Sequence, residues 1–362
     1  MLEIREVGIG YLQSEISLIK LAFNETDALC PTHESMRHKY DDNPANVGAM
    51  AFGAFDQDRL AGLCMYMPAW YQFGNMKLFG VQACDAAVDP EYQRRGLFTQ
   101  ITEAAELYYS NHDVDFFLAC TTLTVHSYPA VKRRGFVEVA HCKYAHIPLN
   151  ISMVVEEKFS VKLPQFIDDV CWAMRLRLLR RAKRNKQLRI EKDRASFLTV
   201  SGDYSDERIR LDIGQDVLNW RCSGDKFFYY TIFEGKRAIA QFIVKKIGVV
   251  AVVIEHCFFI ETVKKRLEAV SLLAKEARVG GFGVLSFWTA LGTPDMETFV
   301  RAGAIKYDNS KHGIPYMVKV LTEDPEKAAV LNNLALWQPM RIELDTVIDN
   351  FDTTKYERHF FR

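Results

Sequence analysis

Apolar and polar positions along the chain follow both strand and helix periodicities, and their order predicts a mixed fold. In the first half, helical spacing occurs at 14–23 and 33–40, and apolar or alternating runs typical of strands occur at 2–7, 49–55, 59–73 and 77–88. A long helix is predicted from 97 to 109, then a strand at 116–119, a short helix at 127–134, and a strand ending near 148. This order predicts an α/β (mixed α+β) sheet flanked by helices.

The second half repeats this order at a shift of about 168 residues when Gly303 is set on Gly135. Strands are predicted at 227–233, 237–246, 249–259 and 283–288, and helices at 261–278 and 294–301. The fold is therefore expected to be used twice. We expect a first domain at 1–150, a basic helical linker at 151–200, a degenerate second copy at 201–324, and a tail at 325–362 that packs on the second domain.

The segment between the strand ending at Val88 and the helix starting near Leu97 is the most informative in the chain. The first amides of a helix have no partner within the helix, and the positive end of the helix dipole favours an anion there. Arg94 and Arg95 add positive charge, and Gly96 lets a phosphate approach the backbone. The chain has neither a Gly-x-Gly-x-x-Gly nor a Gly-Lys-Ser/Thr motif at this loop, so another phosphate-bearing ligand is expected.

The run from Gln93 to Phe98 resembles the acyl-coenzyme A pyrophosphate loop of the GNAT acyltransferase superfamily, whose usual form is Arg/Gln-x-x-Gly-x-Gly/Ala. Phe98 departs from this form by replacing the last small residue. Downstream, the strand, the helix and the sequence from Arg134 to Phe136 resemble the second half of a GNAT domain. The resemblance covers about residues 1–150, and it extends to the two-domain branch that acts on amino sugars in bacterial surface-polysaccharide pathways.

The resemblance implies an acyl-coenzyme A cosubstrate, acetyl or another short acyl. No metal is expected, because no cluster of His, Cys and Asp in the sequence has ligand spacing. In the family, the pantetheine arm lies along the fourth strand and uses its backbone, and the phosphates lie at the loop. The residues implied here are Ala86, Ala87 and Val88 for pantetheine, and Gln93, Arg94, Arg95, Gly96, Leu97, Phe98 and Thr99 for the phosphates.

Three side chains are candidates for catalysis. Asp85 is a single acid in an apolar strand, so it should be either paired or functional, ideally as a base with a raised pKa. His126 precedes the short helix and is a second candidate base, although a capping or core role explains it equally well. Where GNAT enzymes often place a thiolate-protonating tyrosine, this chain has Val131; Tyr128, one turn earlier, is either a substitute acid or a packing residue.

The second copy lacks the features of the loop. Its corresponding segment, 260–264, has no glycine and no arginine pair, so we expect it to bind no coenzyme and to form a wall of the acceptor pocket. The segment 175–194 holds ten Lys or Arg against Glu191 and Asp193. It is either a solvated helix face or a source of cations for a diphosphate.

Composition limits the remaining function classes. Lys plus Arg and Asp plus Glu are both 46, so no overall field favours nucleic acid. The eight cysteines are scattered, and no signal peptide or membrane span is expected, which favours a cytoplasmic protein. We expect acyl transfer to a small-molecule amine, with a nucleotide-linked amino sugar implied by the resemblance. An aminoglycoside, polyamine or protein amine, or a non-catalytic acyl-coenzyme A sensor, remain alternatives.

Overall fold

The computed structural model describes residues 2–23, 31–45, 51–120, 127–179, 188–201, 208–306, 313–344 and 347. The first half contains β1 (Glu3–Glu6), α1 (Leu12–Phe23), α2 (His33–Tyr40), β2 (Ala51–Asp56), β3 (Arg59–Phe73), β4 (Met76–Val88), α3 (Leu97–Ser110), β5 (Phe116–Cys120), α4 (Ser127–Arg133) and β6 (Val137–Pro148). These elements agree with the order predicted from hydrophobic periodicity.

The second half adds the remaining elements. They are α5 (Ile151–Phe159), α6 (Gln165–Leu179), β7 (Leu188–Glu191), α7 (Arg194–Ser201), β8 (Arg210–Leu211), α8 (Gln215–Arg221), β9 (Phe227–Glu234), β10 (Arg237–Ile247), β11 (Val250–Phe258), α9 (Val263–Val279), β12 (Val284–Ala290), α10 (Pro294–Arg301), β13 (Ile305–Lys306), β14 (Ile314–Val320) and α11 (Pro325–Leu331).

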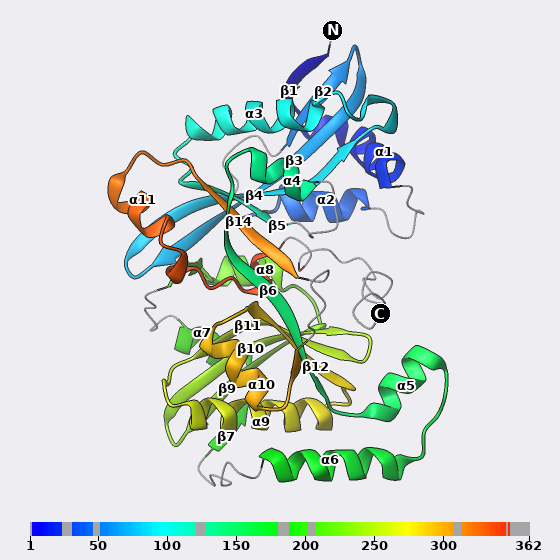
Figure 1. The fold of residues 1–362 in the computed structure, drawn as a ribbon, viewed down its shortest axis with the longest axis vertical. Coiled ribbons are helices and arrows are strands. Elements are labelled where there is room, and N and C mark those ends of the chain that lie inside the picture. The colour runs from blue at the N-terminus through cyan, green and yellow to red at the C-terminus, as the bar shows by residue number, and fades with distance from the viewer. Residues whose placement is uncertain are drawn as a thin grey trace.

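The described strands form one sheet in the order β1-β2-β3-β4-β5-β14-β6-β12-β11-β10-β9-β7 (Figure 1). Only the pairs β4–β5 and β11–β12 are parallel among the described neighbours. Alternate residues of β3 face opposite layers: Leu63 and Met65 pack under α1 and α2, whereas Cys64 packs under α3. The predicted mixed, mostly antiparallel sheet flanked by helices is confirmed.

Two strands join the halves of the molecule. β14, from the end of the chain, pairs with β5 of the first half, and β6, from the first half, pairs with β12 of the second. β6 and β14 also pair with each other at the centre of the sheet (Figure 1). The element order β-β-β-α-β-α-β thus occurs twice, which is consistent with two GNAT-like units, and each unit is completed by the other's last strand.

The segment predicted as a basic helical linker is not helical throughout. It contains β7, which pairs antiparallel with β9. Leu188 and Ile190 pack against the core of the second half, while Arg189 is exposed, so this stretch has the alternation of an edge strand.

The described part of the tail contacts both halves, whereas the prediction placed it on the second domain. Lys327 on α11 forms an ion pair with Asp115 of the first half, with an Nζ–Oδ1 distance of 2.9 Å. The Trp337 ring packs edge-on against Phe116 of β5 and also contacts Tyr316 of β14. The tail therefore covers the centre of the sheet.

Candidate functional site

The loop between β4 and α3 has a fixed, tight conformation. Asp89 accepts a hydrogen bond from the Glu91 amide at 3.0 Å and pairs with Arg59 at 2.6 Å. Arg94 and Gly96 have φ values of +62° and +78°, in the left-handed region where glycine is favoured. These two residues reverse the chain so that α3 starts directly above the end of β4.

The first amides of α3 face solvent without partners in the described chain. Gly96 has no side chain to cap the helix, and the first internal hydrogen bond runs from the Gln100 amide to the Gly96 carbonyl at 3.1 Å. The amides of Leu97, Phe98 and Thr99 are therefore available to a ligand at the positive end of a 14-residue helix. These are the amides at which the sequence predicts an anion-binding site.

The side chains of the loop have different positions relative to these amides. Gln93 donates to the Val88 carbonyl at 3.2 Å and holds the strand end. Arg95 donates to the Glu91 carbonyl at 2.9 Å, and its guanidinium lies 5.0 Å from the Tyr92 ring centroid. Phe98, the departure from the family form, packs against the core under α3.

The parallel strands β4 and β5 separate next to the start of α3. Their pairing runs from Gly80 opposite Phe116 to Ala83 opposite Ala119, and β4 then continues through Val88. No strand in the described ranges pairs with this edge of β4 beyond Ala83. The backbone around Ala86 and Ala87 is therefore open to a ligand that adds like a strand.

A bulge in β4 places Asp85 at the start of this open edge. Leu63 of β3 lies opposite Ala87 and Met65 lies opposite Cys84, so Asp85 and its neighbour have no regular partner. Asp85 has a φ of +39°, which is strained for a residue with a side chain.

Asp85 is held as a carboxylate. Its Oδ2 accepts from the Lys39 ammonium at 2.7 Å and from the Tyr40 hydroxyl at 2.5 Å, both on α2. Burial alone would raise the pKa of Asp85, but Lys39 and these two hydrogen bonds outweigh burial and hold it below its usual value. The expected base with a raised pKa is therefore not found here: Asp85 is paired.

A second carboxylate in this region, Glu15, was missed by the sequence analysis. It lies on the buried face of α1 with Leu12, Leu18 and Ile19, and it is 2% exposed. Burial, followed by the charges of Asp41 and Asp85, raises the pKa of Glu15 to about 7. The available signal was an acid within the apolar stripe of the helix.

Tyr128 lies in a hydrogen-bonded chain. Its hydroxyl donates to Glu138 Oε2 at 3.0 Å, and His141 Nδ1 lies 2.9 Å from Oε1 of the same carboxylate. Tyr128 also packs beside Ala119 at the end of β5. His126, the other candidate base, lies outside the described residues.

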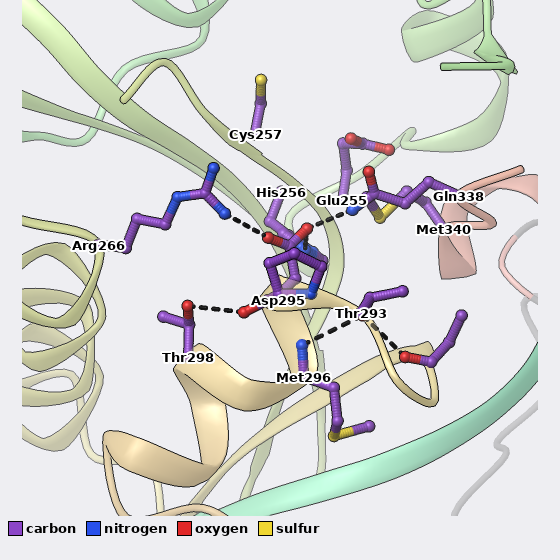
Figure 2. A network of polar contacts seen from close by, with 12 residues as sticks. Glu255, His256, Cys257, Arg266, Thr293, Asp295, Met296, Thr298, Gln338 and Met340 are labelled. Atoms are coloured by element: carbon purple, nitrogen blue, oxygen red, sulfur yellow. Dashed lines mark hydrogen bonds and ion pairs between the residues drawn. The ribbon is translucent and has the colours of Figure 1, made fainter. Parts of the chain in front are cut away.

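The second half has a similar separation of strands, but side chains fill it. β11 and β12 pair from Val250 opposite Val284 to Val253 opposite Phe287, after which β11 continues to Phe258. Just beyond, Asp295 on α10 binds His256 of β11 at 3.1 Å and Arg266 of α9 at 3.0 Å, as Figure 2 shows.

The tail closes this network, because Gln338 also donates to Asp295 (Figure 2). The hydrogen bond with His256, together with the charges around Asp295 that include Arg208 and Arg266, outweighs burial and holds the pKa of Asp295 down at about 2. Arg266 additionally donates to the Ile260 carbonyl at 2.7 Å, so its guanidinium occupies the approach to the start of α9. This region has no open loop equivalent to 93–96.

The aromatic residues Trp70 and Tyr71 of β3 lie away from the open edge. Trp70 pairs with Phe79 across β3 and β4, whereas the bulge lies opposite Cys64. Trp70 is six positions along the strand from Cys64, which is roughly 20 Å. Tyr71 is a core residue buried against Phe116, whereas Trp70 is 42% exposed.

Membrane-spanning helices and metal-ligand clusters are both absent from the described residues. No described helix combines the length and apolarity needed to cross a membrane. No three His, Cys, Asp or Glu side chains in the described ranges are grouped so as to hold a metal ion.

Comparison with known proteins gives a domain assignment for the first part of the chain. Residues 3–138 match the family described as acetyltransferase (GNAT) domain. No curated protein matches the chain in sequence.

Solved structures share the fold across both halves. A probable N-acyltransferase from Enterococcus faecalis aligns over 89% of this chain and 73% of its own, with a TM-score of 0.61 and 13% identity. A GCN5-related N-acetyltransferase from Anabaena variabilis gives the same coverages, with a TM-score of 0.59 and 9% identity.

N-myristoyltransferase from Saccharomyces cerevisiae, solved with bound myristoyl-CoA, aligns over 88% of this chain and 78% of its own, with a TM-score of 0.55 and 11% identity. At these identities the similarity concerns the fold. Together with the family match, it supports an acyl-coenzyme A-dependent N-acyltransferase.

Proposed function

We propose that this chain, whose residues 3–138 match a GNAT acetyltransferase domain, transfers an acyl group from acyl-coenzyme A to a primary amine. The observation that carries the proposal is the set of unpartnered amides at the start of α3, directly beside the open edge of β4. A diphosphate fits the amides, and the peptide-like pantetheine arm fits the strand edge.

In this proposal the pyrophosphate lies at residues 93–99 and the pantetheine arm lies along 86–88. The thioester then lies near Asp85 and the end of β5, where Tyr128 packs beside Ala119. Tyr128 is our candidate for protonating the leaving thiolate, because α4 holds its hydroxyl near the end of β5. The second half binds no coenzyme, since the Arg266–Asp295 network fills the equivalent region.

For the acceptor we propose the amino group of a nucleotide-linked amino sugar; the support is the resemblance of the chain to the two-domain GNAT branch. A second candidate is a cationic amine such as a polyamine or aminoglycoside. The observation favouring it is local charge: Asp41 and Asp85 both act on Glu15 as like charges, while Lys39 is paired with Asp85. Such an excess of carboxylates attracts a cation.

The acceptor class is tested by following free thiol release from acetyl-coenzyme A with a panel of amino sugars, nucleotide-linked amino sugars, polyamines, aminoglycosides and peptides. Turnover with one class identifies the acceptor. Tight coenzyme binding without turnover on any amine would instead indicate a non-catalytic acyl-coenzyme A sensor.

The coenzyme site is tested by Gly96→Glu, which places bulk and negative charge at the amides. Acetyl-coenzyme A affinity, measured by calorimetry, should fall by more than tenfold, about 1.4 kcal/mol. The matched control is Gly74→Glu, at another glycine with positive φ (+55°) and open space, in the turn between β3 and β4. Unchanged affinity in Gly96→Glu, or an equal loss in both variants, contradicts the assignment of the loop.

A further inference from the structure

We propose that Glu15 accepts the proton that the acceptor ammonium group loses before it attacks the thioester. The inference rests on the proposed acyl transfer and assigns one of its steps to a residue outside the coenzyme loop. It follows from how α1, α2 and β4 meet at the open edge of the sheet.

Glu15 lies where these three elements converge. The buried face of α1 packs on the sheet through Leu12 and Leu18, in one cluster with Cys84 and Ala87 on either side of the β4 bulge. Glu15 is on that same face of the helix, so its carboxylate is directed toward the strand rather than into bulk solvent. Because Asp85 of β4 and Asp41 beside α2 both act on its charge, Glu15 lies on the face of the sheet where the Asp85 carboxylate meets α2.

Asp85 is unsuited to accept the proton. The same oxygen, Oδ2, already accepts from the Lys39 ammonium and the Tyr40 hydroxyl. Protonating Asp85 would break a contact to an ammonium that is itself 2% exposed, leaving a buried charge without its carboxylate. Asp85 thus remains negative, and its role is to hold Lys39 and to attract a cationic acceptor.

Glu15 has no such counterion. No ion pair to Glu15 is formed within the described chain, while Asp41 on α2 and Asp85 on β4 both act on it as like charges. Lys39 on α2 is bound to Asp85, and Arg37, also on α2, acts on Asp41. Burial and the like charges of Asp41 and Asp85 raise the pKa of Glu15 to about 7, so Glu15 exchanges a proton near neutral pH.

A carboxylate poised near neutral pH is suited to general base catalysis. In the proposed step, the ammonium group of the acceptor gives one proton to Glu15, and the resulting amine attacks the thioester carbon. The C–S bond breaks as the C–N bond forms, and the thiolate takes up one proton. Glu15 then returns its proton to solvent, so that each turnover yields the amide, free coenzyme A and one proton.

The strained backbone at Asp85 is consistent with this assignment. Its φ of +39° and the adjoining bulge turn the carboxylate toward α2, where it meets Lys39. In a regular strand, the side chains of Cys84 and Asp85 would point to opposite faces of the sheet, and the Asp85 carboxylate would not meet α2.

The experiment compares Glu15→Gln, Glu15→Asp and Asp41→Asn with the full-length wild-type chain. The assay follows thiol release from acetyl-coenzyme A with the panel amine that gives the highest rate, over pH 5.5 to 9. Acetyl-coenzyme A affinity is measured on the same samples. In parallel, infrared spectroscopy follows the protonated-carboxyl band through the same pH range without substrate.

Glu15→Gln should lower kcat by about 100-fold or more, remove the acidic limb of the kcat/KM profile and leave coenzyme affinity unchanged. Glu15→Asp should restore part of the rate. Asp41→Asn, which removes a like charge beside Glu15, should move the limb to lower pH. The carboxyl band that titrates near pH 7 should be absent in Glu15→Gln, whereas the band of Glu343, whose pKa is raised to about 8, should remain in both proteins.

The outcomes separate this inference from the proposed function. Turnover with an unchanged rate and pH limb in Glu15→Gln would overturn the role of Glu15 alone. An infrared pH titration of this variant that is identical to that of the wild type would do the same. Absence of turnover with every amine would overturn the proposed acyl transfer and, with it, the proton transfer.

Discussion

Glu343 gives the sharpest quantitative prediction, because it is a carboxyl group buried at the centre of the sheet. It is 2% exposed, and its oxygens accept hydrogen bonds from the Tyr316 hydroxyl and from the Met340 amide at 3.0 Å. Burial exceeds the effect of these bonds and of the nearby Arg221, and it raises the pKa of Glu343 to about 8. The perturbation is Glu343→Gln, which keeps the shape and removes the titration.

The sign follows from proton binding. The pKa of Glu343 is about 8 in the folded chain, whereas the ordinary pKa of a glutamate, which applies to the unfolded chain, is 4.5. Between these pH values the folded state therefore binds one proton more than the unfolded state. Stability from Glu343 is therefore fully present below pH 4.5 and is lost as the pH rises through 8, by about 1.4 kcal/mol per pH unit and about 5 kcal/mol in all. Glu343→Gln lacks this dependence.

The assay is urea unfolding at pH 5.5, 6.5 and 7.5, followed by tryptophan fluorescence. Between pH 5.5 and 7.5, the stability of Glu343→Gln relative to wild type should improve by about 3 kcal/mol. All other titrations cancel in this comparison, because both proteins share them. Glu326→Gln, an exposed carboxylate on α11, is the matched control and should show no pH-dependent difference. A constant difference for Glu343→Gln at the three pH values would refute the reasoning.

Two further predictions concern packing and charge. A Cβ at Gly80 would lie 2.3 Å from Phe116 Cζ. Gly80→Ala should therefore force β4 and β5 apart and destabilise the protein by about 1–3 kcal/mol, measured as a lower urea midpoint. An unchanged midpoint would contradict the close contact. Asp295→Asn leaves the cation of Arg266 buried beside His256 and should cost about 3–5 kcal/mol in the same assay. An unchanged urea midpoint in Asp295→Asn would contradict this buried pairing.

Local features of the site were predictable from the sequence because they depend on neighbouring residues. The apolar run to Val88, the Gln93–Gly96 loop and the helical spacing after it determine a strand, a reversal and a helix start, and the structure has each of them. The left-handed conformation at Gly96 is the kind that a glycine at this position indicates. The direction of the Phe98 side chain could not be predicted, because it is determined by packing against the core under α3.

The electrostatics of the site could not be read from the sequence. Asp85 was expected to be either paired or functional, but the choice depends on Lys39 and Tyr40, which are 46 and 45 residues away in the chain. Glu15 carries a local signal, an acid in an apolar stripe, yet its raised pKa arises from burial and from charges on α2 and β4. Such shifts depend on how helices dock, which periodicity does not specify.

Strand pairing explains why the second half is needed even if it binds no coenzyme. An alternating strand such as β6 predicts a place in a sheet but not its neighbour, and here β6 pairs with β12 while β14 pairs with β5. Without β14, the edge of β5 from Phe116 to Cys120 would lose its hydrogen-bond partners, and this strand supports the open edge of β4. Trp337 and Lys327 add tail contacts to the same place. The C-terminal half therefore completes the sheet of the N-terminal half through main-chain pairing.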